Sequence, residues 1–314
     1  MNFVSLLNTI ATIALLLATG FGLRKWGVID NAVSKGLSSI IVKVAQPMLI
    51  ISSLISLEYS AENLKKGLTA LALSLGVHFV LGILAHFGAF GIRDFDERKI
   101  AEFAVMFTNC GFIGFPIIES LYGAEGLFCG AFYVVGFHLF TWTWGMAILS
   151  RGRDDIKLTP KKIFVNFGTV PCLIGFILFL LPFDLPPFFS MTAGYLANLA
   201  TPVSVLITGS LIATGSLREL FGRGKNYYVA ALRLLVFPAV ICVGLKLCGL
   251  SEFFVIFGTV MAAMPSASVV TMFGELYNIN PPYASRLVGL TSILCVVTLP
   301  LAVAFGAWVA ALPL

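Results

Sequence analysis

The chain has 314 residues, of which 59% are hydrophobic and 11% are Asp, Glu, Lys or Arg, and its formal net charge is +5. An ordinary soluble domain carries roughly 25% charged residues. The apolar residues come in runs of about twenty, long enough at about 1.5 Å per residue to cross a hydrocarbon layer. This composition excludes a soluble enzyme, a nucleic-acid-binding protein and a disordered chain. It predicts an all-α protein that crosses a membrane several times.

The first apolar run, residues 3–23, is followed by basic residues rather than preceded by them. A secretory signal has its charge first and a shorter apolar stretch, so we expect this run to be a retained span. The six cysteines lie in or near apolar runs and lack metal-ligand spacing. We expect them to be buried small side chains, and we expect neither a metal nor an organic cofactor.

Charged residues and clusters of Gly, Pro and Asn mark the loops and divide the chain into ten predicted spans. The expected ranges are 4–23, 36–57, 66–89, 99–121, 126–149, 163–181, 190–214, 226–247, 252–274 and 284–311.

Alternate loops differ in their basic residues, since one set contains 14 of the 20 Lys and Arg residues and the other contains 3. Cytoplasmic loops are enriched in Lys and Arg. The first set is therefore predicted to be cytoplasmic, with both termini outside a plasma membrane. Topology then explains the positive net charge, and no nucleic-acid partner is expected.

Several residues recur at a constant shift of 155 positions, which predicts two related halves, 1–155 and 156–314. The matched pairs are Gly20 with Gly175, Pro47 with Pro202, His78 with Arg233, and Leu121-Tyr122 with Leu276-Tyr277. Five spans in each half is an odd number, so the second half enters the membrane from the opposite side. Inverted repeats of this kind are typical of secondary transporters, whose sites lie near the midplane between the halves.

The fourth and ninth spans each contain helix-breaking residues at mid-depth. These are Asn109, Gly111, Gly114 and Pro116 in one span, and Pro265, Ser266 and Ser268 in the other. Because unpaired backbone is costly in hydrocarbon, such breaks must be shielded by protein or line a wet cavity. If the breaks face each other, their half-helix N-termini suit a carboxylate. The alternative is that each proline only kinks its helix.

These segments resemble the auxin efflux carrier family, in its branch of bacterial permeases for small organic anions. The resemblance covers the whole chain and is most specific in F-T-N-C-G-F-I-G-F-P, residues 107–116. L-R-K-W-G-V-I-D after the first span and M-P-S-A-S in the ninth support it. It implies a ten-span inverted-repeat fold, similar to that of bile-acid transporters and sodium/proton antiporters, in which spans four and nine cross at their breaks.

The resemblance also implies a division of labour among the spans. Spans one, two, six and seven are expected to form a scaffold that makes a homodimer in the lipid bilayer, and the other six an elevator-like transport unit. The residues of the two breaks would bind the substrate, with Gln46 and Ser52 or Ser53 of span two close by. The short segment between the halves, about residues 151–162, favours a small carboxylate such as malonate, malate or lactate over an indole acid.

Two of the ionisable residues inside predicted spans are candidates for function. His78 is at mid-span, and because a histidine has an unperturbed pKa of about 6.5 it is the first candidate for proton coupling. Its alternative is a neutral histidine bonded to a carbonyl. Arg233 is predicted either to neutralise a substrate carboxylate or to replace a bound cation, and otherwise to reach the cytoplasmic surface.

The sequence supports other functions less well than transport of a small organic anion. Sodium coupling, as in a bile-acid transporter, stays open because Asn109, Ser266 and Ser268 offer oxygen ligands, but no carboxylate joins them at mid-depth. An aromatic-acid exporter also stays open. An intramembrane enzyme is disfavoured because H-E-x-x-H and G-x-S-x-G are absent. A channel or receptor has no need for inverted repeats.

Overall fold

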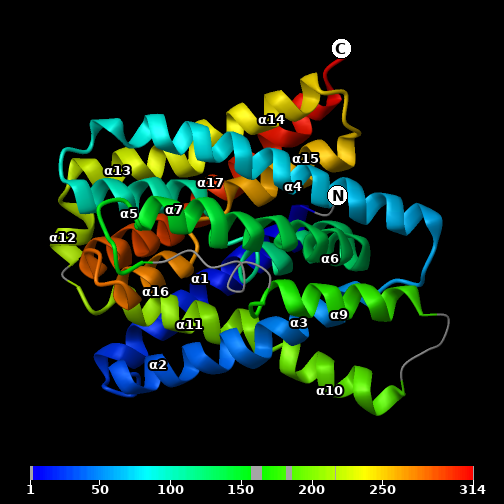
Figure 1. Ribbon diagram of the computed structural model, residues 1–314, viewed down its shortest axis with the longest axis horizontal. Helices are drawn as coiled ribbons and strands as arrows, with labels where there is room; N and C mark the ends of the chain where they lie inside the picture. The colour runs from blue at the N-terminus through cyan, green and yellow to red at the C-terminus, as the bar shows by residue number, and fades with distance from the viewer. Residues whose placement is uncertain (1–2, 157–164, 182–185, 216, 314) are drawn as a thin grey trace. The chain divides into compact units, whose positions relative to one another are not determined.

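The computed structural model describes residues 3–156, 165–181, 186–215 and 217–313, and the regular elements in these ranges are helices (Figure 1). Seven helices are long and apolar enough to cross a membrane, and two shorter apolar helices accompany them. The seven are Val4–Lys25, Asn31–Leu54, Ala61–Gly91, Gly114–Leu149, Pro187–Ile212, Gly224–Leu247 and Pro281–Ala311, and the two are Thr169–Leu180 and Glu252–Ala263. The chain is therefore a multi-pass helical membrane protein.

The helices follow one another closely along the chain. The first half contains α1 (Phe3–Lys25), α2 (Asn31–Ile40), η1 (Ile41–Ala45), α3 (Gln46–Leu54), α4 (Ala61–Gly88), η2 (Ala89–Gly91), α5 (Phe95–Met106), α6 (Gly114–Phe140), η3 (Thr141–Gly145) and α7 (Met146–Leu149). The second half contains α9 (Thr169–Leu180), α10 (Pro187–Ala197), α11 (Ala200–Ile212), α12 (Leu217–Phe221), α13 (Gly224–Ala231), η4 (Leu232–Val236), α14 (Phe237–Leu247), α15 (Glu252–Ala263), α16 (Val269–Leu276) and α17 (Pro281–Ala311).

Several helices begin where the sequence supplies a capping side chain. Asp30 accepts a hydrogen bond from the Val33 amide at 2.8 Å, and Asp94 accepts one from the Glu97 amide at 2.8 Å. Asn280 caps α17, whose first residue is a proline. A side-chain oxygen at these positions satisfies an amide that has no partner within the helix, and proline fits the first turn because it has no amide hydrogen to satisfy.

Helical residues occupy the described part of each of the ten predicted ranges. The predicted loop between the fourth and fifth spans falls at Gly123, which interrupts α6 with φ 58° and ψ −141°. A positive φ is tolerated at this position because glycine has no Cβ. The expected start of the sixth span at residue 163, and the basic residues Lys157, Lys161 and Lys162, lie outside the described residues. The count of ten spans and the opposite orientation of the halves remain predictions.

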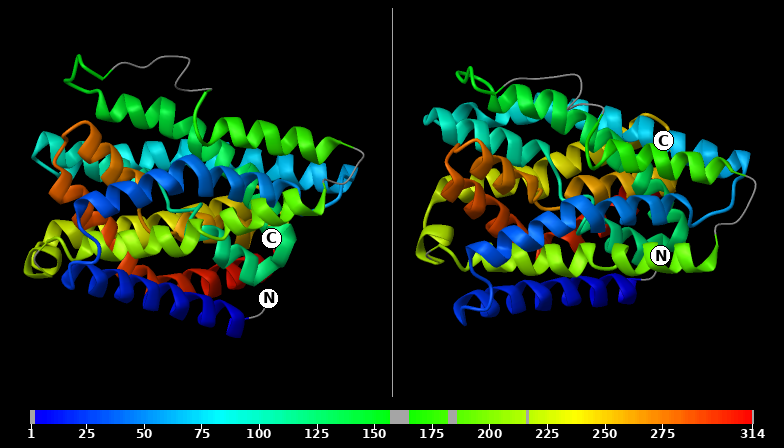
Figure 2. Two further views of the ribbon diagram at one scale, coloured as in Figure 1. Left: turned by 90° about the horizontal axis from the view of Figure 1, so that it is seen from below. Right: turned by 60° about the horizontal axis from the view of Figure 1, so that its bottom comes forward.

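Packing divides the chain into two compact units, each built from several stretches of sequence. Unit 1 comprises Met1–Leu75, Gly111–Trp142 and Leu158–Ser210, and unit 2 comprises Gly76–Cys110, Thr143–Lys157 and Leu211–Leu314. Within unit 1, α3 packs against α9 and α10 (Figures 1 and 2). Within unit 2, α14, α15 and α17 pack against one another. The predicted division into a scaffold and a transport unit remains a prediction.

Two glycines of unit 1 allow α1 and α11 to touch backbone to backbone. A Cβ atom at Gly20 would lie 2.1 Å from the carbonyl oxygen of Leu206, and one at Gly209 would lie 2.1 Å from that of Leu17. Membrane helices associate through such small residues because lipid supplies no hydrophobic drive for helix pairing. The close contact between α1 and α11 therefore depends on glycine, which has no side chain, at positions 20 and 209.

Gly175, which matches Gly20 at the shift of 155, plays the same part in α9. A Cβ atom there would lie 2.8 Å from Cδ1 of Leu54 and 3.2 Å from the Cα of Ile51, both in α3. The first predicted span thus packs against the seventh, and the sixth against the second. Such a pattern is expected of two related halves in which the first span of each half packs against the second span of the other half.

We expect Gly20→Ala to lower the melting temperature of the purified protein in detergent. The added methyl group must displace the backbone of α11, and overpacking of this kind costs about 1–3 kcal/mol. Gly22→Ala is the matched control on the same helix, because its Cβ would lie 3.8 Å from the nearest atom, in Trp26. Equal melting temperatures for the two variants would contradict the proposed α1–α11 contact.

Candidate functional site

Two helices of unit 2 end abruptly within apolar sequence, and both interruptions lie where the sequence predicts a break. The first interruption, residues 107–113, separates α5 from α6, and the second, residues 264–268, separates α15 from α16. Phe107 and Met264, the first residues of the two interruptions, both have extended backbone angles. Each of these predicted spans is therefore built from helical pieces rather than from one rod.

Proline chemistry explains the second interruption. The ring of Pro265 disfavours the helical region for the residue before it and removes a backbone donor. Met264 accordingly has φ −61° and ψ 152°. The first interruption differs in this respect, because Pro116 lies in the first turn of α6, which begins at Gly114. There it helps to start the second helix piece, since an amide in the first turn has no partner in the helix.

The two interruptions pair with each other through their backbones. Thr108 and Ser266 form an isolated antiparallel β-bridge. The amide of Asn109 donates to the carbonyl of Pro265 at 2.7 Å, and the amide of Ala267 donates to the carbonyl of Phe107 at 3.0 Å. Each interruption therefore supplies partners that the other lost when its helix ended, as burial in a membrane requires.

Ser266 ties this bridge to two further helices. Its hydroxyl donates to the carbonyl of Ala104 in the last turn of α5 at 2.9 Å. Its amide donates to the Thr291 hydroxyl of α17 at 3.1 Å. Thr108, Asn109 and Ser266 are all buried. We call the paired segments 107–110 and 264–268 of unit 2 the crossover.

Arg233 is fully buried beside the crossover. It lies in the π-helical turn η4, and its Nη1 donates to the carbonyl of Val105 in the last turn of α5. The cytoplasmic surface, which the sequence left as an alternative, is therefore not the position of this guanidinium.

His78 of α4 is also fully buried, and its ring centroid lies 6.3 Å from that of Phe107. The two ionisable residues that the sequence matches at a shift of 155 thus both lie against the end of α5. Ser268 is the residue that precedes α16, and its carbonyl accepts a bond from the Thr271 hydroxyl at 2.7 Å.

The remaining predicted site residues, Gln46, Ser52, Gly111, Gly114 and Pro116, belong to unit 1. Within that unit, Nε2 of Gln46 lies 3.1 Å from Nε2 of His138, which is not among the predicted site residues. Ser53 is buried, and its hydroxyl donates to the carbonyl of Leu49 at 2.7 Å.

A comparison with protein families decides the class of this protein. The sequence profile of a family described as membrane transport protein matches residues 5–161 and 153–303, and therefore almost the whole chain. The chain belongs to this family, the auxin efflux carriers.

Two archaeal relatives of this chain are also named as transporters, in agreement with the family assignment. A protein of Methanothermobacter thermautotrophicus, named an uncharacterized transporter, is 26% identical over 317 residues, covering 96% of this chain and 98% of its own length. A second uncharacterized transporter, from Methanocaldococcus jannaschii, is 25% identical over 290 residues, covering 87% of this chain and 90% of its own. The similarity thus extends over the full length of a transporter.

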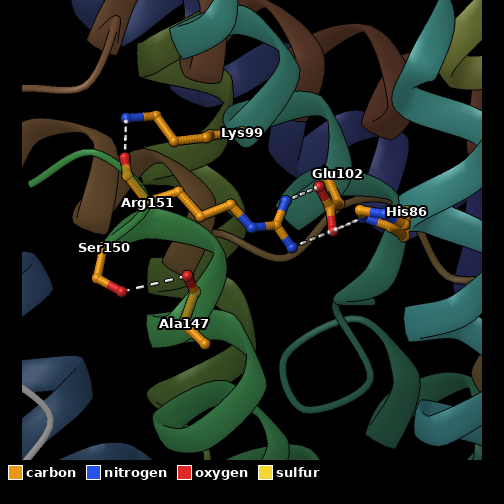
Figure 3. A network of polar contacts seen from close by, with 6 residues as sticks. All are labelled: His86, Lys99, Glu102, Ala147, Ser150 and Arg151. Atoms are coloured by element: carbon orange, nitrogen blue, oxygen red, sulfur yellow. Dashed lines mark hydrogen bonds and ion pairs between the residues drawn. The ribbon is translucent and has the colours of Figure 1, made fainter.

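A second polar cluster of unit 2 surrounds Glu102 on α5 (Figure 3). The Glu102 side chain is completely buried. The two Nη atoms of Arg151 bind its two oxygens at 2.5 and 2.9 Å, and Nδ1 of His86 lies 3.1 Å from Oε1. This cluster fastens the segment after α7 and the end of α4 to α5.

Neighbouring residues of α5 form further ion pairs with other elements of unit 2. Lys99 is nearly buried, with its Nζ 2.8 Å from Asp96 and 3.3 Å from the carbonyl of Arg151. Glu97 pairs with Lys225 of α13. Charged or polar side chains from three other segments therefore bind the first two turns of α5. These segments are α4, the stretch after α7, and α13.

Sequence reasoning missed this cluster. Lys99 and Arg151 are among the basic residues counted for the topology, and His86 is not among the predicted site residues. The available signal was Glu102, a carboxylate three residues inside a predicted span, because such a group needs a cationic partner. The identity of that partner depends on contacts across about fifty residues of chain, which no local pattern specifies.

We expect Arg151→Met to destabilise the transporter more than Glu102→Met. The first change leaves a buried carboxylate without its main cation, whereas the second leaves an arginine whose side chain is 35% exposed and can be hydrated. Removing one partner of a buried ion pair lowers the free energy of unfolding by about 3–5 kcal/mol. Because Arg151 is partly exposed, we expect the loss for Arg151→Met to lie near the lower end of this range. Thermal unfolding in detergent measures the difference.

Arg153→Met is the matched control for this comparison. Arg153 pairs with Asp155 at 2.8 Å on the surface, and its hydrogen bond lowers the pKa of Asp155 to about 2, so the pair stays charged at every pH of interest. Exposed pairs contribute little. The interpretation of the Glu102 cluster is wrong if Arg153→Met destabilises the protein as much as Arg151→Met.

Proposed function

We propose that this protein is a secondary transporter for small organic anions, namely mono- or dicarboxylates such as malonate, malate or lactate. The observation that carries the proposal is the crossover, where two interrupted helices share a short antiparallel contact among buried residues of unit 2. Transporters build sites from such discontinuous helices, because backbone groups freed from a helix can bind a substrate at mid-membrane depth.

The chemistry of the crossover favours a negative substrate. The helix α16 begins at Val269, directly after the second interruption, and the positive end of a helix dipole lies at its N-terminus. Asn109, Ser266 and Ser268 add an amide and two hydroxyls to the same region. The buried Arg233 contributes a positive charge to the same unit. Gly111, Gly114, Pro116, Gln46 and Ser52 remain proposed contributors from unit 1.

Alternating access of the elevator type is the mechanism we propose. It is supported by the antiparallel contact of Thr108 with Ser266, and by the exchange of partners at Gly20 and Gly175. Both features are expected of inverted repeats, in which one bundle moves as a rigid body past the other. We further propose a homodimer in the plasma membrane, formed through the scaffold spans, with both termini outside.

We expect Asn109→Ala to abolish uptake of radiolabelled malonate, malate or lactate by proteoliposomes, because it removes an amide from the crossover. The three acids are tested separately, each with and without sodium and with and without a proton gradient. Asn8→Ala is the matched control, since Asn8 is exposed on α1. Size-exclusion chromatography and thermal unfolding establish that both variants are folded.

Two outcomes of this experiment would contradict the proposal. Wild-type uptake by folded Asn109→Ala would remove the crossover from the substrate site. Uptake that an excess of substrate inside the vesicles does not accelerate would indicate a channel rather than a carrier. Strictly sodium-dependent uptake would favour a carrier similar to the bile-acid transporters, and preference for an indole acid would favour an aromatic-acid exporter.

We propose His78 as the group that couples transport to protons. His78→Gln keeps a hydrogen-bonding side chain but cannot be protonated near neutral pH. We expect this variant to lose stimulation by an inward proton gradient and to keep substrate exchange at equal pH. His86→Gln, on the same helix, is the control. Proton-driven uptake by His78→Gln at the wild-type level would exclude this role.

A further inference from the structure

Arg233 is placed where a helix presents its negative end. The helix α5 ends at Met106, so the carbonyls of its last turn that follow Phe103 need partners from outside the helix. The aligned peptide dipoles add a charge of about −0.5 at this end. In discontinuous membrane helices, such C-terminal ends are places where a transported or coupling cation binds.

Two carbonyls of this last turn accept hydrogen bonds from side chains of the second half of the chain. The Phe103 carbonyl accepts from the Phe107 amide directly after the helix at 3.0 Å, whereas the Ala104 carbonyl accepts from the Ser266 hydroxyl at 2.9 Å. The Val105 carbonyl accepts from the Arg233 guanidinium. A charged donor forms roughly twice as strong a hydrogen bond as a neutral one. The guanidinium therefore supplies the positive charge at this helix end.

The local backbone holds Arg233 toward the protein interior. Arg233 and Leu234 are buried, whereas Leu235 and Val236 are about half exposed. The π-helical turn η4 closes with a bond from the Phe237 amide to the Leu232 carbonyl, and Pro238, which has no amide hydrogen, follows at once. Such π-turns are found mainly as single turns and frequently at functional sites.

We infer that Arg233 is a resident cation that replaces a bound metal ion at the end of α5, and that it does not bind the substrate. An arginine keeps its charge at every physiological pH, so the negative helix end is neutralised throughout the transport cycle. It follows that transport needs no sodium. This inference rests on the proposed function, because it assigns a positioning role within the same site.

The test removes the side chain and supplies its head group in solution. In Arg233→Ala, we expect the maximal uptake rate to fall at least about tenfold while the KM for the carboxylate stays within about twofold, since a positioning residue affects kcat more than substrate binding. Guanidinium chloride at low millimolar concentration should restore at least half of the rate. Wild-type uptake should be equal in sodium and choline buffers.

Arg286→Ala is the matched control, because Arg286 lies in the same unit and pairs with the half-exposed Glu219 at 3.4 Å. Guanidinium should not improve uptake by this variant. A rise in KM at an unchanged maximal rate in Arg233→Ala would make Arg233 a substrate ligand and overturn the inference. A folded Arg233→Ala with wild-type rate, or one that guanidinium fails to rescue, would also overturn it.

A binding measurement separates this inference from the proposed substrate. Low millimolar guanidinium should raise the melting temperature of purified Arg233→Ala and leave those of the wild type and Arg286→Ala unchanged. Should Arg233→Ala not survive purification, its recovery in guanidinium-containing buffer gives the same result, and failure to recover it there contradicts the inference. Guanidinium stabilisation without uptake of any carboxylate would reject the proposed substrate class and keep the role of Arg233.

Discussion

The crossover, the candidate site of this transporter, depends on backbone hydrogen bonds between two interrupted helices. A membrane interior supplies no water for an amide or carbonyl that has left its helix, so every interruption must find partners in protein. Here the two interruptions supply partners to each other, through the bonds of Asn109 to Pro265 and of Ala267 to Phe107. The bonds are reciprocal, because each segment donates one amide and offers one carbonyl to the other.

Two buried charges in unit 2 are stabilised in different ways. Glu102 is neutralised by a formal ion pair with Arg151, which fixes a distant segment of the chain to α5. Arg233 instead binds a carbonyl and faces the partial charge of a helix end. Both groups act on the same helix α5, one near its middle and the other in its last turn. The end of α5 that leads into the crossover thus contacts Arg233, and the same helix carries the ion pair of Glu102 with Arg151.

The sequence predicted those features that depend on local chemistry. Pro265 forces the residue before it out of the helix, and Gly123 marks a turn, so breaks and loops could be placed from residue type alone. The burial of Arg233 and His78 agrees with their positions in apolar runs. Contacts between distant segments were not predictable in this way, as the pairs Glu102–Arg151 and Gln46–His138 illustrate. The place of Pro116 in the first turn of α6 was also missed, because a proline both ends one helix and suits the start of another.

The different chemistry of Arg233 and His78 suits them to the different parts that we propose for them in a transport cycle. Both lie against the end of α5, one through the Val105 carbonyl and the other beside the Phe107 ring. A guanidinium that never loses its proton can neutralise a helix end, but it cannot couple the cycle to a proton gradient. An imidazole changes its charge near neutral pH and can do so. If the charge at the helix end is constant, any change of charge at the crossover must come from the substrate or from His78. Under these proposals, coupling to protons and independence from sodium would both follow from the different roles of these two residues.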